Sequence, residues 1–349
     1  MKNFFKVLGK IVLGILAVIL LWTIFVYGMR YYNDQKYKPQ DYNAEDYSAP
    51  TELSQYNQEI DGVEVEHIEG EYLNGFHLKP EDKKHKGVVI TFGGSEGSPA
   101  YYTAEPLAKE GYEVLSLFYF GMDNQQKELV EVPLDFFDEV LTYIDENVSD
   151  NEDITVVGAS KGAELCLNLT TRYPEIDNVV LYAPTAWNYM GLSFEDYSNV
   201  RSSWTWQGEP LPYINSNTAG GMTGVNLMLD FILKRPVQYR PGYEAAAEKA
   251  DNKEEARIKV EESQANLLIF AGAKDMMWQS EVSAQAIADK RPDKTEVHVF
   301  DQAGHLFLGD WYQYMGEIIL AMGGDPKHNE EAGMESNQIL LEKLAEWHS

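Results

Sequence analysis

The stretch that decides the fold is Ile154-Thr-Val-Val-Gly158-Ala-Ser160-Lys-Gly162. Its first part, Ile154 to Gly158, is apolar and typical of a strand buried on both faces, whereas Lys161 to Tyr173 has the pattern of a helix. A serine between the two lies on a tight turn, and glycines are needed two positions to either side because side chains there would collide with neighbouring backbone. We therefore predict that Ser160 projects into solvent as a nucleophile. The alternative is that Ser160 only caps the helix.

Strand-like and helical segments alternate on both sides of this turn. Further strands are expected over Gly87–Phe92, Glu113–Phe118, Val179–Tyr182, Leu267–Ala271 and Glu296–Phe300, and further helices between Ser98 and Gly111, between Pro133 and Val148, and over Ser280–Arg291. The first of these helices should be capped by Ser98, with Pro99 in its first turn and Gly111 at its end. An antiparallel hairpin over residues 63–78 precedes them. The alternation predicts an α/β fold with a mostly parallel, doubly wound sheet.

One connection is too long for a simple crossover between strands. Between Pro184 and Asn266 lie 81 residues, which include a Trp/Gly/Pro-rich segment, Trp204 to Tyr213, and a charged helix expected near Glu244 to Glu262. Long insertions of this kind are usually functional. We interpret residues from about 186 to 265 as a cap over the mouth of the sheet. The alternative is a purely structural excursion.

A serine nucleophile needs a general base, and the base needs an acid that orients it. Asp275 follows the strand that ends in Gly272, and His305 follows the strand that ends in Phe300. The carboxyl ends of parallel strands meet at one edge of a sheet, and Ser, Asp, His is the chain order of this kind of triad. Of the seven histidines, His305 is the one placed at a strand end. We therefore predict a triad of Ser160, Asp275 and His305, with a solvated turn aspartate as the alternative for Asp275.

Two backbone segments could stabilise negative charge on a substrate carbonyl oxygen. One is the N–H of Lys161 at the start of the helix, where the helix dipole helps. The other is the glycine-rich segment Gly93–Gly97, in which Gly94 or Ser95 is our candidate for the second donor. A glycine-rich loop before a helix could instead bind a phosphate, but neither of the common nucleotide-binding patterns is present.

Several classes of function are disfavoured by composition. The chain of 349 residues has a formal net charge of −28, and such a surface repels the phosphates on which nucleic-acid binding depends. No His or carboxylate pair has the spacing of a zinc hydrolase, so we expect neither a metal nor another cofactor. The single cysteine, Cys166, is expected to pack as a small buried apolar residue rather than to act as the nucleophile.

The N-terminus has the pattern of a membrane span. Ile11 to Met29 is a run of 19 uncharged residues, about 28 Å long as a helix, which is close to the thickness of a bilayer core. No small-residue cleavage site follows it, so we prefer an uncleaved anchor to a signal peptide. Residues 1–30 would then form a cytoplasmic stub and a transmembrane helix. Residues 31–58, polar and without periodicity, would form a tether.

Charges beside the span predict its orientation. Lys2, Lys6 and Lys10 precede it, and the acidic residues Asp34, Asp41, Glu45 and Asp46 follow it. By the positive-inside rule the N-terminus lies in the cytoplasm. We therefore expect a single-pass protein of the cell membrane whose remaining part is extracytoplasmic.

Segments throughout the second part of the chain resemble one family. They are Leu117–Gly121, Gly158–Leu165, Gly208–Pro212, Gly272–Ser280, Ala303–His305 and Gly323–Pro326 followed by Asn329 and Ala332. They look like segments, in the same order, of the C-terminal catalytic domain shared by acyl-CoA thioester hydrolases and bile acid-CoA:amino acid N-acyltransferases. The resemblance implies an α/β-hydrolase fold over residues 59–349 and assigns Ser160, Asp275 and His305 the same roles. Amino-acid-conjugating members have cysteine at the nucleophile, so Ser160 favours hydrolysis.

Three functions are therefore compared. The first is a membrane-anchored serine hydrolase that cleaves an acyl-CoA-like thioester or a carboxylic ester through an acyl-enzyme. The second is an extracytoplasmic esterase or serine peptidase that acts on envelope or xenobiotic substrates. The third is a non-catalytic binding protein that retains the fold. The expected partners are a small acyl substrate and the lipid bilayer; the sequence leaves protein partners unknown.

Overall fold

The structure is a computed structural model that describes residues 2–43, 49–193, 196 and 198–349. Glu45 and Asp46 of the acidic flank lie outside the described residues. Across the described part, an eight-stranded sheet has the order β1-β2-β4-β3-β6-β7-β10-β11. Its strands are β1 (Val63–Glu69), β2 (Asn74–Pro80), β3 (Val88–Phe92), β4 (Val114–Leu117), β6 (Ile154–Ala159), β7 (Asn178–Tyr182), β10 (Asn266–Gly272) and β11 (Thr295–Phe300). The pairs β1–β2 and β2–β4 are antiparallel and the others are parallel, which confirms the expected hairpin and the mostly parallel sheet.

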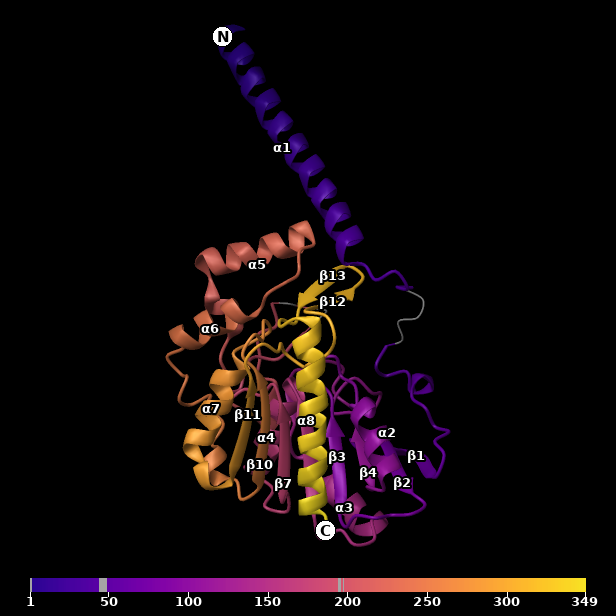
Figure 1. The fold of residues 1–349 in the computed structure, drawn as a ribbon. Coiled ribbons are helices and arrows are strands. Elements are labelled where there is room, and N and C mark those ends of the chain that lie inside the picture. Colours follow the sequence, from indigo (N-terminus) through magenta and orange to yellow (C-terminus); the bar gives the residue numbers. More distant parts are fainter. Residues whose placement is uncertain (1, 44–48, 194–195, 197) are drawn as a thin grey trace.

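Helices cover both faces of this sheet (Figure 1). One face packs against α3 (Phe136–Asn147), α4 (Lys161–Thr170) and α7 (Ser280–Lys290), and the other packs against α2 (Tyr101–Glu110) and α8 (Pro326–Trp347). Neighbouring residues of a strand serve opposite faces: Val156 belongs to the first core and Val157 to the second. This double burial explains why the parallel strands are continuous apolar runs.

The start of α2 differs from the expectation. The helix begins at Tyr101, and its N-cap residue is Ala100 with φ 54°, so the predicted cap at Ser98 with Pro99 in the first turn is wrong. The Pro99 carbonyl accepts hydrogen bonds from two buried hydroxyls of the sheet, those of Thr91 and Ser116, and these bonds hold this segment outside the helix. The predicted end at Gly111, with φ 97°, is confirmed.

The long connection contains short elements: β8 (Trp204–Trp206), β9 (Glu209–Pro210), η3 (Ser216–Ala219), α5 (Gly221–Leu233), α6 (Arg240–Lys249) and η4 (Val260–Glu262). The strand β8 also pairs with β5 (Val132–Pro133). The expected charged helix is wrong in its extent, because α6 ends at Lys249 and turns follow. Arg257, which follows those turns, forms ion pairs with Glu254 and Glu261 outside any α-helix. The apolar helix α5 was not expected.

At the N-terminus, α1 (Lys2–Tyr37) is longer than the predicted span. Its residues Phe4–Tyr37 have a mean hydropathy of 2.6 at their most apolar and are long and apolar enough to cross a membrane, although a signal sequence would have the same properties. Most of the helix projects away from the rest of the protein (Figure 1). Its last residues contact a hairpin of β12 (Tyr312–Met315) and β13 (Ile318–Ala321), since the Tyr37 ring packs against those of Trp311 and Tyr312. The first residues of the expected tether are therefore helical.

Candidate active site

Ser160 occupies the tight turn between β6 and α4. Its backbone angles, φ 55° and ψ −117°, lie in a region that costs energy for any residue with a side chain. The turn is possible because Gly158 and Gly162 have no β-carbon. A β-carbon at Gly158 would lie 2.3 Å from the Gly162 carbonyl oxygen, and one at Gly162 would lie 2.0 Å from the Gly93 carbonyl oxygen, and both distances are too short. The glycines around Ser160 are thus needed for the steric reason that the sequence suggested.

The three residues predicted for a triad lie in one hydrogen-bonded chain. The Ser160 Oγ lies 2.9 Å from the His305 Nε2, and the His305 Nδ1 lies 2.8 Å from an Asp275 carboxylate oxygen. Because a carboxylate only accepts hydrogen bonds, the proton of the imidazole sits on Nδ1, and Nε2 is free to accept the serine proton. Asp275 is 1% exposed and His305 is 2% exposed, so bulk water has little access to this pair.

Backbone groups hold the two supporting residues in place. The other Asp275 carboxylate oxygen accepts hydrogen bonds from the backbone N–H groups of Met277 (2.8 Å) and Trp278 (3.1 Å). The His305 N–H donates to the Met322 carbonyl (2.8 Å). Near the start of α8, the buried Asn329 accepts from the Gly304 N–H at 2.8 Å. In the sequence, Asn329 appeared only in one of the segments that resemble the family. Its contact with the loop that carries His305 could not be predicted, because it depends on how α8 packs against that loop.

The segment expected to supply backbone donors lies against the serine. A β-carbon at Gly94 would be 3.4 Å from the Ser160 Cβ, so the glycine allows the loop to approach closely. The Gly94 N–H donates to a Glu96 carboxylate oxygen at 3.0 Å and would have to leave it to serve a substrate. Lys161 begins α4 beside Ser160, as predicted. Lys161 and Gly94 therefore lie in or beside the turn, and Ser95 is the next residue of the same loop.

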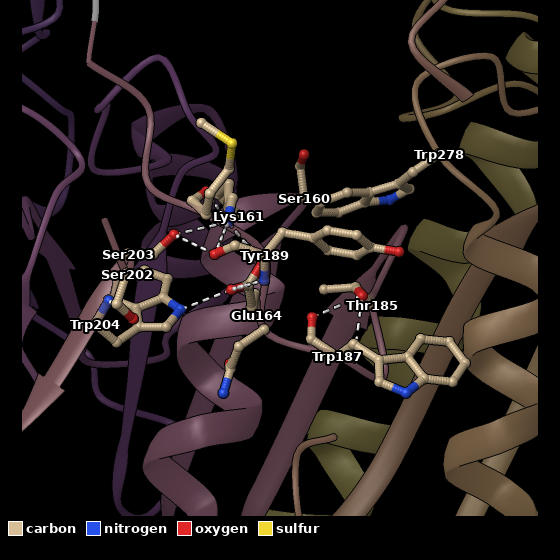
Figure 2. A network of polar contacts seen from close by, with 12 residues as sticks. Ser160, Lys161, Glu164, Thr185, Trp187, Tyr189, Ser202, Ser203, Trp204 and Trp278 are labelled. Atoms are coloured by element: carbon tan, nitrogen blue, oxygen red, sulfur yellow. Dashed lines mark hydrogen bonds and ion pairs between the residues drawn. The ribbon is translucent and has the colours of Figure 1, made fainter. Parts of the chain in front are cut away.

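The side chain of Lys161 has a separate role that the sequence analysis missed. Figure 2 shows it directed into the protein, apart from the Ser160 hydroxyl. Its Nζ lies 2.8 Å from a Glu164 carboxylate oxygen and donates to the Ser203 Oγ at 2.8 Å. The other Glu164 oxygen accepts from the Trp204 Nε1 (2.8 Å) and the Tyr189 N–H (3.2 Å). The only feature of the sequence that pointed to this ion pair was the spacing of Lys161 and Glu164, three residues apart on one helix.

This ion pair is buried, with 2% of the Lys161 side chain and none of the Glu164 side chain exposed. Burial lowers the pKa of Lys161 and raises that of Glu164 because it disfavours both charged forms, and the contacts between them oppose that effect. Such a pair adds little net stability to the fold. The two side chains must nevertheless stay in contact, because a buried charge without its partner would strongly destabilise the protein. The pair therefore ties the turn at Ser160 to the segments around Tyr189 and Ser203 in the long connection.

Cys166 and His298 are the nearest alternatives to the predicted nucleophile and base. Cys166 lies within α4 and is fully buried, and burial raises the pKa of its thiol, which keeps it protonated and unreactive. His298 lies within β11, and its Nε2 contacts the Glu296 carboxylate at 2.8 Å. Among the described residues, no cluster of three or more His, Cys, Asp or Glu side chains is placed to hold a metal ion.

Comparison with family models identifies the chain. The model described as BAAT / Acyl-CoA thioester hydrolase C terminal matches residues 132–332, which is more than half of the chain and includes Ser160, Asp275 and His305. The chain belongs to this family. The resemblance inferred from short segments is thereby confirmed.

Curated members of the family are distant in sequence. Human acyl-coenzyme A thioesterase 6 is 22% identical over 277 residues, and human acyl-coenzyme A thioesterase 1 is 24% identical over 263 residues. These alignments cover 75% and 71% of this chain but only 60% and 55% of the relatives. The chain therefore matches little more than half the length of these thioesterases.

Solved structures establish the fold class. An esterase from Pyrococcus furiosus matches with a TM-score of 0.50 and 16% identity, over 89% of this chain and 97% of the esterase. The acylaminoacyl peptidase of Pyrococcus horikoshii matches with a TM-score of 0.51 and 13% identity, over 85% of this chain and 44% of the peptidase. At such identities the likeness concerns the fold alone. Together with the family membership it confirms an α/β-hydrolase-like fold with a mostly parallel sheet.

Proposed function

We propose that this BAAT/thioester hydrolase family member is a serine hydrolase that cleaves acyl thioesters of the acyl-CoA type through an acyl-enzyme on Ser160. The observation that carries the proposal is the hydrogen-bonded chain from the Ser160 Oγ through His305 to Asp275. The names of the aligned thioesterases support the choice of an acyl thioester. A non-catalytic role is disfavoured, because such a protein has no need to keep all three side chains in contact.

Acylation follows from this geometry. The Ser160 Oγ attacks the acyl carbonyl while its proton passes to the His305 Nε2, and the resulting imidazolium is stabilised by the Asp275 carboxylate. The negative charge on the carbonyl oxygen is stabilised by the Lys161 N–H and by a donor from the glycine-rich loop. We favour Ser95 as that second donor, because the Gly94 N–H already donates to Glu96. Collapse of the intermediate breaks the carbon–sulfur bond, and the thiol leaves with the proton from His305.

Deacylation repeats these steps with water. His305 takes a proton from the water, whose oxygen attacks the acyl carbonyl, and it returns the proton to the Ser160 Oγ as the fatty acid leaves. The serine and the imidazole end as they began.

The same steps would cleave a carboxylic ester with an alcohol as leaving group. An extracytoplasmic esterase or peptidase is thus the second candidate, which the apolar helix α1 favours because acyl-CoA is an intracellular metabolite.

The substrate class is tested with a hydrolysis panel on the full-length protein in detergent. We expect long-chain acyl-CoAs to be hydrolysed with a higher kcat/KM than p-nitrophenyl esters or aminoacyl amides. The reverse order would favour the esterase or peptidase. Absence of turnover on every substrate, without labelling of Ser160 by a fluorophosphonate, would contradict hydrolase function altogether.

We further propose that α1 anchors the protein in the cell membrane, with residues 1–30 as stub and span, the following residues to 58 as a connection, and 59–349 as the extracytoplasmic hydrolase domain with its cap at about 186–265. The support is the apolar helix together with the charge asymmetry at its two ends. Protease added to intact cells should then cut between residues 38 and 58. Protection of this segment until the membrane is permeabilised would reverse the orientation and place the domain beside cytosolic acyl-CoA.

A further inference from the structure

The helix α5 is apolar but hardly buried. Its sequence, Gly221-Met-Thr-Gly-Val-Asn-Leu-Met-Leu-Asp-Phe-Ile-Leu233, has one charged residue, and Leu233 is its one buried residue. Met222 is 73% exposed, Met228 53% and Val225 43%. An amphipathic helix of a water-soluble domain turns such side chains toward the core. A contiguous patch of exposed apolar side chains such as this marks a surface that is covered by another apolar body, which is either a protein partner or a lipid membrane.

The position of α5 beside α1 indicates that this covering body is a membrane. The helix runs across the end of the domain beside the base of α1 (Figure 1). The Arg30 guanidinium donates to the Phe231 carbonyl at 3.1 Å, and the Asn33 amide donates to the Leu233 carbonyl at 2.8 Å. The C-terminal end of α5 therefore lies level with residues 30–33 of α1.

That level is where α1 would leave a bilayer. The uncharged run of α1 ends at Arg30, and the exposed rings of Tyr27, Tyr31 and Tyr32 surround this point. Tyrosines and the first charged residue after a span are typical of the layer between lipid tails and water. Since α5 is hydrogen-bonded to α1 at this level, a bilayer that contains α1 brings its headgroup layer against α5.

Polar contacts hold the two helices at this relative position. Asp34 of α1 forms an ion pair with Lys234, directly after α5, and accepts a hydrogen bond from the Tyr314 hydroxyl at 2.5 Å. Arg30 forms a second ion pair, with Glu317 at 2.9 Å. These contacts join α1, α5 and the β12–β13 hairpin, so α5 cannot turn away from the membrane without breaking them.

We call the place where residues 30–37 of α1 meet the end of α5 and the β12–β13 hairpin the junction. The charge near this junction also permits contact with lipid. The chain as a whole is strongly acidic, with a net charge of −28. Five basic residues nevertheless lie close to the junction, in α1 and just after it or just after α5: Arg30, Lys36, Lys38, Lys234 and Arg235. Five acidic residues lie there as well: Asp34, Asp230 and Glu317 in ion pairs with these bases, Asp41 after α1, and Asp310 beside Tyr312. Positive and negative charges are therefore balanced at this end, in contrast to the acidic excess of the whole chain, which weakens the repulsion from an anionic lipid surface.

The candidate active site lies just behind the same junction. His305 donates its backbone N–H to the Met322 carbonyl, and the Met322 N–H in turn donates to the Trp311 carbonyl at 2.7 Å. The Trp311 ring packs against Tyr37 at the end of α1. Two backbone hydrogen bonds and one ring contact thus link the proposed base to the membrane helix.

We propose that α5 lies in the interfacial layer of the bilayer that α1 enters, and that the active site takes acyl substrates directly from this lipid surface. Apolar helices of this kind insert about 5–10 Å into the boundary between headgroups and acyl chains. The substrate class is then an acyl thioester or ester whose acyl chain is dissolved in the membrane. This inference rests on the proposed function in two respects: its placement of α5 takes α1 as an anchor, and its uptake of substrate takes Ser160 as the nucleophile of an acyl hydrolase.

The placement is tested with fluorescent labels on the full-length protein in phosphatidylcholine vesicles. Single cysteines replace Met228 in α5, Ile19 in α1 and, as a matched control, Met334 on α8, which is 62% exposed. The native Cys166 is fully buried and so does not compete for an NBD label. We expect the label at position 228 to show blue-shifted emission and quenching by a nitroxide placed near the headgroups. The label at position 334 should show neither.

The outcomes separate the two proposals. If the label at position 228 behaves as that at 334 while the label at 19 is quenched by a nitroxide deep in the bilayer, α1 is an anchor but docking of α5 is wrong. If the label at 19 is not quenched either, the anchor itself is wrong, and the membrane placement of α5 falls with it.

Uptake of substrate from lipid has its own measurement. For each variant, the rate on a long-chain acyl ester held in vesicles is divided by the rate on a short water-soluble ester. We expect Met228→Glu to lower this ratio, because a charge in the interfacial layer weakens docking, and Met334→Glu to leave it unchanged. Equal ratios in the two variants would show that the substrate does not come through the surface around α5.

Discussion

Replacement of Ser160 by alanine is expected to lower turnover by ~10³-fold or more, because no acyl-enzyme can form without the hydroxyl. The fold should persist, since alanine keeps the small side chain that this turn accepts. The measurement combines the hydrolysis rate on the preferred substrate with fluorophosphonate labelling and peptide mapping. Labelling should occur on Ser160 in the unmodified protein and disappear in the variant.

The matched control is Cys166→Ala, six residues further along the chain. Cys166 is fully buried, and burial raises the pKa of its thiol, so its loss should leave most of the activity intact. A collapse of activity in this variant with unchanged thermal stability would indicate thiol chemistry. Undiminished turnover by Ser160→Ala, or an adduct on another serine, would remove Ser160 from the mechanism.

Replacement of His305 by alanine is expected to cost about as much as loss of the serine, ~10³-fold or more, since members of a triad act as a unit. The reason is geometric: the His305 Nε2 is 2.9 Å from the Ser160 Oγ and is the group placed to take its proton. Steady-state rates on one soluble substrate measure the effect. Circular dichroism and thermal melting establish whether the variant is folded.

His298→Ala provides the comparison for this variant. His298 lies within β11, the strand that precedes His305, and contacts Glu296, so its replacement should change turnover little. If both histidine variants had similar modest effects, another group would have to serve as base. Asp275→Asn should also lower turnover strongly, because the amide can donate to the His305 Nδ1 and so leave the imidazole proton on Nε2, which then cannot accept the serine proton.

The two proposals together describe an enzyme that works at a surface. The proposed nucleophile, acid and base follow the carboxyl ends of β6, β10 and β11. The loop of the base is hydrogen-bonded through Met322 to Trp311, whose ring packs on the end of α1, and the exposed apolar helix α5 lies beside the base of α1 (Figure 1). An enzyme that meets long-chain acyl groups in lipid avoids the cost of extracting them into water, which is about 0.8 kcal/mol per CH₂ group. The position of the site thus has a physical advantage for apolar substrates.

The sequence by itself determined the features that depend on a few neighbouring residues. A buried strand, a Gly-x-Ser-x-Gly turn and a helix specify the position of Ser160, because steric exclusion at the glycines acts over two residues. Asp275 and His305 could be found because parallel strands bring their carboxyl ends to one edge. The apolar run of α1 was equally plain, since hydropathy needs no partner to be recognised.

Only the tertiary structure decided the features that depend on residues far apart in the chain. Lys161 was expected at the turn, but its side chain pairs with Glu164 and reaches Ser203, a contact that exists only because the long connection after β7 folds back onto α4. The helix α1 continues to Tyr37 because its last turn packs on rings contributed by a distant hairpin. Local pattern marks α5 as apolar, but burial is a property of the whole fold, and packing left this helix at the surface.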